Sequence, residues 1–267
     1  MTLESYILHG GAPGAARLEV LARAYWPTTR ALLERVGVRP GMRVLDLGCG
    51  RGDVTVELAR LVAPGGAAVG IDADGAVLEH ARALARERGV EPVFEQRDAL
   101  EDSGHRDLDL VYARFLLSHV RSPEAAVARM RRALRPGGLV VVEDVDFPGH
   151  FCHPPCAAFA RYVELYMAAA RLRGADATIG PRLPALLLDA GLEVRGVDVV
   201  QPAFVDGDGK LVAQLTMAAI RDAVVTAGLA SAAEVEALIA ELDAYRTTPG
   251  TVETLARVVR AWVVLPA

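Results

Sequence analysis

Short apolar segments alternate with longer amphipathic ones between residues 44 and 143 of this 267-residue chain. The short segments have the length and the valine and leucine content of buried strands, and they lie at 44–47, 68–71, 91–96, 108–112 and 139–143. Helical periodicity fills three of the intervals, over 55–62, 77–88 and 123–134. Parallel strands need crossover connections of this length, so the alternation predicts an α/β fold with helices on both faces of a mostly parallel, Rossmann-like sheet.

The flanking segments complete the predicted fold. Helices are expected over 18–36, 156–173 and 184–190, two more within 207–246, and further strands over 192–204 and 258–265, which bring the sheet to seven strands. Pro27 marks a break or a fresh first turn in the first helix, and Ser231, with Glu234 three residues later, is expected to cap the last helix. We divide the chain into a core with an amino-terminal flap and helix at 1–150, a helical lid that includes the strand 192–204 at 151–246, and a closing strand of the core sheet at 247–267.

The composition disfavours several classes of protein. The chain is 52% hydrophobic, but no apolar stretch reaches the 18 residues that suggest a membrane-spanning helix, so we expect no membrane insertion. The amino-terminal sequence has an early acid and no basic region before an apolar run, which favours a cytoplasmic protein without a secretory signal. A net charge of −5 disfavours nucleic acid as a partner, and three cysteines do not make a disulfide framework. We expect a small-molecule substrate and a monomer or homodimer.

Three glycines separate the strand 44–47 from the following helix. Gly48, Gly50 and Gly52 stand where side chains would keep a ligand away from the backbone, which indicates a cofactor-binding turn. A tight turn without a ligand would explain two of the three, and dinucleotides also use glycine-rich turns. Asp46, two residues before the first glycine, would repel a pyrophosphate but could hold a cationic amine, so it favours a cofactor that carries one.

Acidic residues also end the next two strands. Asp72 lies 24 residues beyond Gly48, where a carboxylate can accept hydrogen bonds from both hydroxyls of a ribose. Asp74 is the better cap for the following helix, which leaves Asp72 for the ribose. Asp98 closes the third strand and could accept from the exocyclic amine of adenine, with a loop-capping role as the alternative.

The run from Val44 to Glu143 resembles the cofactor-binding core of class I methyltransferases, which use S-adenosylmethionine (SAM). The resemblance rests on the order of the glycine turn, the acids that end the second and third strands, and the Pro136–Gly138 turn before the fifth strand. It implies SAM as cofactor, S-adenosylhomocysteine (SAH) as product, and methyl transfer to oxygen, nitrogen or carbon of a small molecule. The chain is similar to the menaquinone and small-molecule branch, a resemblance that suggests natural-product or quinone biosynthesis.

The same resemblance assigns positions in the cofactor site. It implies that Gly48, Cys49 and Gly50 line the methionine part, that Ala73 and Ala99 flank the adenine, and that Ala113 offers its carbonyl to the amino group. Two alternatives are kept. A protein of this fold could bind SAM without consuming it, as a cyclase-like or ligand-binding relative does. A nicotinamide oxidoreductase could use the same type of sheet, although the acids around the proposed site oppose it.

Two residues after the fourth strand are candidates for binding or catalysis. Arg114 could bind the methionine carboxylate or an acidic substrate, or it could form a salt bridge to Asp46 or Glu143. His119 could reach the acceptor as a catalytic group, or it could be a structural hydrogen-bonding residue on the following helix.

The amino-terminal flap and the segment after the fifth strand supply the remaining candidates. In the glycine-rich amino-terminal flap, Tyr6 could face the cofactor and Arg17 could neutralise the methionine carboxylate, with a disordered start as the alternative. The segment His150–Cys156 offers two imidazoles and two thiols, but its spacing matches no standard zinc pattern and its prolines restrict the ligands, so we expect no metal. Because this segment leaves the fifth strand, we expect region 151–246 to bind the acceptor. Possible general bases after the fifth strand, with a solvated loop as the alternative for each, are Asp144, Asp146, His150 and His153.

Overall fold

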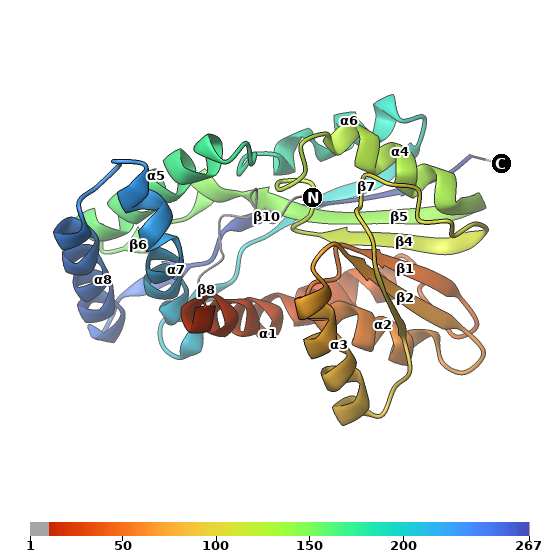
Figure 1. Ribbon diagram of the computed structural model, residues 1–267, viewed down its shortest axis with the longest axis horizontal. Helices are drawn as coiled ribbons and strands as arrows, with labels where there is room; N and C mark the ends of the chain where they lie inside the picture. The colour runs from red at the N-terminus through yellow and green to blue at the C-terminus, as the bar shows by residue number, and fades with distance from the viewer. Residues whose placement is uncertain (1–10, 267) are drawn as a thin grey trace.

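A seven-stranded sheet forms the centre of the computed structural model, which describes residues 11–266 (Figure 1). The strands are β1 (Arg43–Leu47), β2 (Ala67–Asp72), β3 (Val93–Gln96), β4 (Leu108–Arg114), β5 (Leu134–Asp146), β7 (Glu193–Val200) and β10 (Arg257–Val264). Their order is β3-β2-β1-β4-β5-β10-β7, and only β10 runs antiparallel to its neighbours. The predicted α/β class with a mostly parallel, seven-stranded sheet is confirmed. The chain order reverses between β1 and β4, so the ligand crevice of such a sheet lies at their carboxyl ends.

Helices cover both faces of this sheet because successive side chains of its strands point to opposite sides. Val140 and Val142 of β5 pack with α4 (Pro123–Ala133) and α6 (Leu183–Asp189). Val141 packs on the other face with α1 (Gly11–Arg35) and α2 (Asp53–Val62), beside which lies α3 (Gly75–Arg88) (Figure 1). Within residues 11–266, no helix is both long and apolar enough to cross a membrane.

A separate helical layer lies at one end of the sheet (Figure 1). It consists of α5 (Ala157–Leu172), α7 (Val212–Thr226) and α8 (Ala232–Thr247), with a small sheet of β6 (Cys152–His153), β9 (Val252–Thr254) and β8 (Ala203–Phe204). Short 3-10 turns at Phe147–Gly149, Gly180–Arg182 and Asp208–Leu211 connect these elements. The layer has its own apolar cluster, which includes Tyr162, Met217 and Val235. The first half of α1 packs against α7, so this helix joins the layer to the sheet.

Several local predictions can be checked against this fold. The capping box of Ser231 and Glu234 at the start of α8 is confirmed. The break expected at Pro27 is wrong, because α1 runs through it from Gly11 to Arg35. Tyr25, before the proline, packs against Val258, and Leu32, after it, packs under the sheet. This packing on both sides of Pro27 outweighs the helix hydrogen bond that a proline cannot donate.

Two predicted boundaries in the sheet are also corrected. The strand expected over 192–204 divides after Val200, since Pro202 cannot donate to a ladder and β8 joins the small sheet instead. The turn expected at Pro136–Gly138 lies inside β5, at a shift in its register with β4. Gly137 has φ of 73° and its amide donates to the Leu265 carbonyl at 2.9 Å, which keeps the irregular segment attached to the sheet.

Candidate functional site

The glycine turn after β1 is tied to the end of β2. The backbone amides of Gly48 and Cys49 donate to the Ile71 carbonyl at 2.8 and 2.9 Å. Gly48 has φ of 75°, a conformation that favours glycine, and a Cβ there would lie 2.7 Å from Leu116 Cδ1. At Gly50, by contrast, a Cβ would meet nothing within 4 Å, so the backbone is open on this side. The turn is therefore fixed in position and has space beside it for a ligand.

Asp72 connects this turn with the loop after β2. Its Oδ2 accepts from the Gly50 amide and its Oδ1 from the Asp74 amide, both at 2.9 Å. Burial raises the pKa of Asp72, and these backbone hydrogen bonds partly offset that rise. Each oxygen retains a lone pair that could accept from a ribose hydroxyl. Asp74 caps α3 as predicted, because its Oδ1 accepts from the Ala76 amide at 2.8 Å.

The loop after β3 lies against the same edge of the sheet. The Arg97 amide donates to the Asp72 carbonyl at 2.9 Å, which holds the two loops together. Asp98 has the loop-capping contact that was its alternative role, since its Oδ1 accepts from the Leu100 amide at 2.9 Å. Ala99 is buried and Ala73 is half-buried, and both follow neighbouring strands. An adenine contact for these residues stays a prediction.

Asp46 is a carboxylate enclosed beneath the turn. It is 2% exposed, and its Oδ2 accepts from the Thr55 hydroxyl at 2.6 Å. Burial raises the pKa of Asp46 to about 6, although the Thr55 hydrogen bond and the Arg114 charge counteract the rise. Such a group is ionised at neutral pH and would gain stabilisation from a cationic amine.

Arg114 ends β4 on the other side of β1. Within residues 11–266 it forms no salt bridge at 4 Å or less, so the direct ion pair to Asp46 or Glu143 that was its alternative is not present. Its Nη1 donates to the Thr29 hydroxyl of α1 at 3.4 Å. Burial acts to lower the pKa of Arg114, but Tyr112, Glu143 and Asp46 outweigh it and hold that pKa above its usual value. The guanidinium thus stays charged beside the turn.

A buried network fixes the ends of β4 and β5. Glu143 is fully buried and accepts from the Tyr112 hydroxyl at 2.6 Å and from the Thr29 hydroxyl at 3.2 Å. Arg260 of β10 lies 4.0 Å from Glu143 and forms two hydrogen bonds with Asp198 of β7. This network holds α1 and four neighbouring strands in register around the crevice.

The residues at this edge fit SAM as a ligand. An open backbone turn, carboxylates at the ends of β1 and β2, and a guanidinium at the end of β4 lie on three adjacent strands. The carboxylates suit an amino group and a ribose, and the guanidinium suits a carboxylate. Ala113, whose carbonyl was predicted to accept from the amino group, is fully buried in β4 next to Arg114. Cys49 is half-buried and burial raises the pKa of its thiol, so it contributes as an uncharged wall.

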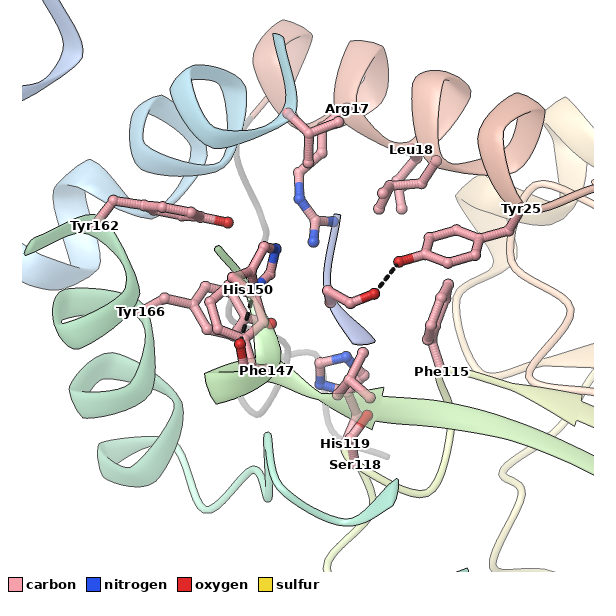
Figure 2. Close-up of a pocket in the computed structure, with 14 residues that line it drawn as sticks. Arg17, Leu18, Tyr25, Phe115, Ser118, His119, Phe147, His150, Tyr162 and Tyr166 are labelled. Atoms are coloured by element: carbon pink, nitrogen blue, oxygen red, sulfur yellow. Dashed lines mark hydrogen bonds between the residues drawn. The ribbon is translucent and has the colours of Figure 1, made fainter. Parts of the chain in front are cut away.

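A cavity lies between the sheet and the helical layer (Figure 2). The space between its atoms, counted together with the open mouth, is about 530 Å³. α1 contributes Arg17 and Tyr25, α5 contributes Tyr162 and Tyr166, and the segments after β4 and β5 contribute Phe115, His119, Phe147 and His150. His150, from the segment that was predicted to line an acceptor pocket, is in this wall, and its contact with an acceptor stays a prediction.

Aromatic rings give this pocket its shape. Phe147 and Tyr166 are stacked, with ring centroids 3.7 Å apart and planes 11° apart. Phe115 packs edge-on to Tyr25 at 5.5 Å, and the Tyr25 hydroxyl donates to the Ala256 carbonyl at 2.6 Å. Phe115 has φ of 55°, which a bulky residue rarely adopts, and a strained backbone of this kind concentrates at functional sites. It follows Arg114 directly, so neighbouring residues face the glycine turn and the aromatic pocket.

Two histidines face the pocket in uncharged form. Burial, together with the charge of Arg17, lowers the pKa of His119 and of His150 to about 4. His150 Nδ1 lies 2.8 Å from the Phe147 carbonyl, which can only accept, so Nδ1 carries the proton and Nε2 is an acceptor. His119 is in the turn between β4 and α4 rather than on the helix, which begins at Pro123.

The other predicted bases lie outside this pocket lining. Asp144 is fully buried, and its oxygens accept from the Ser118 and Val145 amides at 3.1 and 2.8 Å, so it supports the loop that carries His119. Burial raises the pKa of Asp144 to about 6. Asp146 pairs with Arg257, and His153 is exposed on β6. Catalytic roles for Asp144 and His153 stay predictions without a contact to the pocket.

The remaining predicted residues are placed as follows. Tyr6 lies outside the described residues. Arg17 is in the wall of the aromatic pocket, 12 residues before Thr29, which corresponds to about 18 Å along α1 from the helix position that contacts Arg114. Within residues 11–266, no three histidine, cysteine or acidic side chains cluster in a way that could hold a metal ion.

Sequence reasoning did not identify Tyr25, Phe115 or Phe147 as pocket residues. Phe115 and Phe147 each follow the carboxyl end of a parallel strand, and that position was the available signal. Tyr25 gave no such signal, because it lies in the helix before the first strand and follows no strand end.

Comparisons with known proteins agree with this geometry. A family model described as a methyltransferase domain matches residues 39–169. The ubiquinone/menaquinone biosynthesis C-methyltransferase UbiE of Shewanella pealeana is 34% identical over 125 residues, which are 45% of this chain and 49% of that protein. An uncharacterized 37.1 kDa protein in transposon TN4556 of Streptomyces fradiae is 33% identical over 192 residues, 69% of this chain and 52% of the relative. The chain spans about half the length of these curated relatives.

Solved structures show the same fold at low sequence identity. A SAM-dependent methyltransferase from Aquifex aeolicus has a TM-score of 0.51 and 15% identity, with 88% of each chain covered. The [4+2]-cyclase SpnF has a TM-score of 0.56 and 20% identity, with 90% of this chain and 80% of that chain covered. The strand order, the glycine turn with its strand-end acids, and the matched family model together place this chain in the class I SAM-dependent methyltransferase family.

Proposed function

We propose that this protein transfers a methyl group from SAM to a small aromatic molecule bound in the pocket between α1, α5 and the ends of β4 and β5. The supporting observation is that Arg114 and Phe115 are consecutive, one beside the glycine turn and the other in the pocket wall. A cofactor in the turn and an acceptor in the pocket would therefore meet at the end of β4. In-line transfer needs this close approach of the two reacting atoms.

The chain's own residues would hold the cofactor at the strand ends. Asp72 would accept from the ribose hydroxyls, Asp46 would lie near the amino group, and Arg114 would bind the carboxylate. When bound, SAM supplies a methyl group made electrophilic by its sulfonium. Much of the remaining catalysis is positioning, since the pocket brings the acceptor atom in line and its rings exclude water.

The histidines of the pocket would act on an acceptor that must lose a proton. His150 Nε2 is available as a hydrogen-bond acceptor, because Nδ1 donates to the Phe147 carbonyl. His119 lines the same pocket. A hydroxyl of the acceptor that donates to either imidazole would be oriented and made more nucleophilic. A carbon or nitrogen acceptor without a proton to lose would need only the positioning.

Two observations support an aromatic acceptor. Among residues 11–266, five aromatic rings line the pocket besides the two imidazoles, namely Tyr25, Phe115, Phe147, Tyr162 and Tyr166. Flat rings pack favourably against such walls in stacked or edge-on arrangements. The relative from Shewanella pealeana is a quinone-biosynthesis C-methyltransferase by name, and a quinol-like or natural-product ring of this kind is the acceptor class we propose here.

The test is formation of SAH coupled to acceptor consumption. Purified protein is incubated with SAM and a panel of one- and two-ring phenols, quinols and aromatic amines, and SAH and the methylated product are measured by mass spectrometry. We expect equal amounts of both with at least one class. A protein that binds SAM and SAH but yields no methylated product from any class contradicts the proposal.

A second reading is that SAM is bound without being consumed. It is favoured by the structural likeness to the [4+2]-cyclase SpnF over 90% of this chain. The same experiment separates the two readings, because a non-methylating protein would change an acceptor's structure or bind it while SAM remains intact.

A further inference from the structure

Arg17 is a buried cation at the pocket end far from the glycine turn. It is 7% exposed, and its Nε donates to the Thr216 hydroxyl of α7 at 2.7 Å. No carboxylate among residues 11–266 lies within salt-bridge distance of it. Arg260, the other buried arginine, is 6% exposed and has Asp198 as a bonded partner. A buried charge is costly unless it is paired, so the pocket around Arg17 favours an anion.

The geometry of Arg17 leaves its forked end available. Thr216 donates its own proton to the Val212 carbonyl at 2.6 Å and therefore accepts from Arg17. This contact orients the guanidinium through Nε, and among residues 11–266 the two terminal nitrogens have no carboxylate partner. Figure 2 shows the guanidinium projecting from α1 into the pocket, toward His150. Two parallel N–H groups of this kind match the two oxygens of a carboxylate.

The other side chains of the pocket favour a flat molecule that carries the anionic group at one end. Tyr162, Phe147 and Tyr166 lie around the Arg17 end, and the two imidazoles are uncharged. Tyr25, which packs on Phe115, is eight residues beyond Arg17, or about 12 Å along α1. A molecule of one or two fused rings is short enough to lie between these two helix positions.

We propose that the acceptor site binds a planar, conjugated molecule through an anionic oxygen group, preferably a carboxylate, which Arg17 holds at the end of the pocket away from the glycine turn. This inference rests on the proposed function, since it assigns the pocket to the acceptor. It differs from the prediction that Arg17 neutralises the methionine carboxylate of SAM.

The experiment compares a charged probe with its neutral isostere on the full chain saturated with SAH. 2-Naphthoate, 2-naphthamide and 2-naphthol are titrated by calorimetry at pH 7.5 into the wild type, Arg17→Met and Arg17→Lys. Arg23→Met is the matched control, because Arg23 is an exposed arginine on the same helix that pairs with Asp208. We expect Arg17→Met to weaken naphthoate binding about 10- to 100-fold, the range for charged hydrogen bonds, and to leave naphthamide binding unchanged. Arg17→Lys should recover part of the loss, and Arg23→Met should bind like the wild type.

The outcomes distinguish the inference from the proposed function. A wild-type complex that binds naphthoate no better than naphthamide overturns the anion site, while SAH binding leaves the cofactor assignment standing. Tighter binding of neutral naphthol than of naphthoate also overturns it. If Arg17→Met loses SAH but retains naphthoate, Arg17 serves the cofactor instead. A wild type that binds neither SAM nor SAH refutes the proposed function itself.

Discussion

The cofactor edge and the aromatic pocket are adjacent but are built differently. At the cofactor edge, loops after consecutive strands are tied by backbone hydrogen bonds, as when Gly48 and Cys49 share the Ile71 carbonyl. In the pocket, side chains from α1, α5 and two strand ends meet through ring packing. Backbone geometry and a few carboxylates therefore define the cofactor edge, whereas the volume and shape of side chains define the aromatic pocket.

The largest expected effect is on the free energy of unfolding, when a ring of the aromatic pocket is removed. Phe147 is 2% exposed and belongs to the apolar cluster of the helical layer, so Phe147→Ala should lower the free energy of unfolding by about 3–5 kcal/mol. Chemical denaturation measures this loss. Phe151→Ala is the control, since Phe151 is 51% exposed and its truncation should change stability by less than about 0.5 kcal/mol. Equal losses in the two variants would show that the helical layer does not depend on its ring cluster.

The next effect concerns the cofactor edge alone. Asp72→Ala removes an acceptor for two ribose hydroxyls, and two charged hydrogen bonds predict SAH binding weaker by about 100-fold or more. Calorimetry measures the affinity. Asp74→Ala removes the neighbouring helix cap and should lower stability by about 1 kcal/mol without this loss of affinity. If both variants bind SAH equally well, the ribose assignment is wrong.

A pH series tests the buried carboxylate below the turn. The pKa of Asp46 is raised to about 6, and only its ionised form attracts a cationic amine. SAH affinity should therefore be full above pH 7 and fall by up to about tenfold per pH unit below pH 6. Asp46→Asn should bind weakly at every pH and show a flatter profile. A wild-type affinity that stays constant from pH 5 to 8 would contradict a role for the ionised form.

The same carboxylate is expected to have the opposite effect on the stability of the fold, which it lowers when it ionises. Because its pKa is higher in the folded state than in the unfolded one, ionisation of Asp46 lowers stability as pH rises from about 4 to 6. The ligand-free Asp46→Asn protein lacks this cost and should unfold at the same or a higher temperature at pH 7.5. A thermal melt without ligand measures it. A markedly lower unfolding temperature would show that the ionised group stabilises the fold.

The smallest effect is expected in the pocket. The pKa of His119 and of His150 is near 4, so both imidazoles stay uncharged from pH 5.5 to 8. Binding of 2-naphthoate to the SAH complex should be constant over this interval, in contrast with binding at the cofactor edge. Calorimetry at several pH values checks it. A step near the ordinary histidine pKa would mean that one imidazole is solvated and titrates on binding.

Local signals explain which features could be predicted. The Asp74 cap depends on Ala76, two residues away, and the glycine turn and Asp72 stand at the ends of strands with a local apolar pattern, so their positions were accessible from the sequence. The continuous helix through Pro27 and the division of the strand after Val200 were not. Packing on both sides of Pro27 overrode the local propensity in the helix. The strand divides at Pro202, and β8 then pairs with a segment that lies far away in the sequence. The functional roles predicted for these residues await the binding experiments.

The sequence by itself determined the α/β class, the sheet of seven strands and the placement of the acids at the ends of β1, β2 and β3, because period and turn chemistry are local properties. Only the tertiary structure decided which side chains form the pocket. Arg17, Phe115, His150 and Tyr162 are scattered along the chain and come together when α1 packs on α7 and α5 closes over the end of β5. Long-range packing depends on the shapes of all the surfaces involved, and a local pattern does not contain that information.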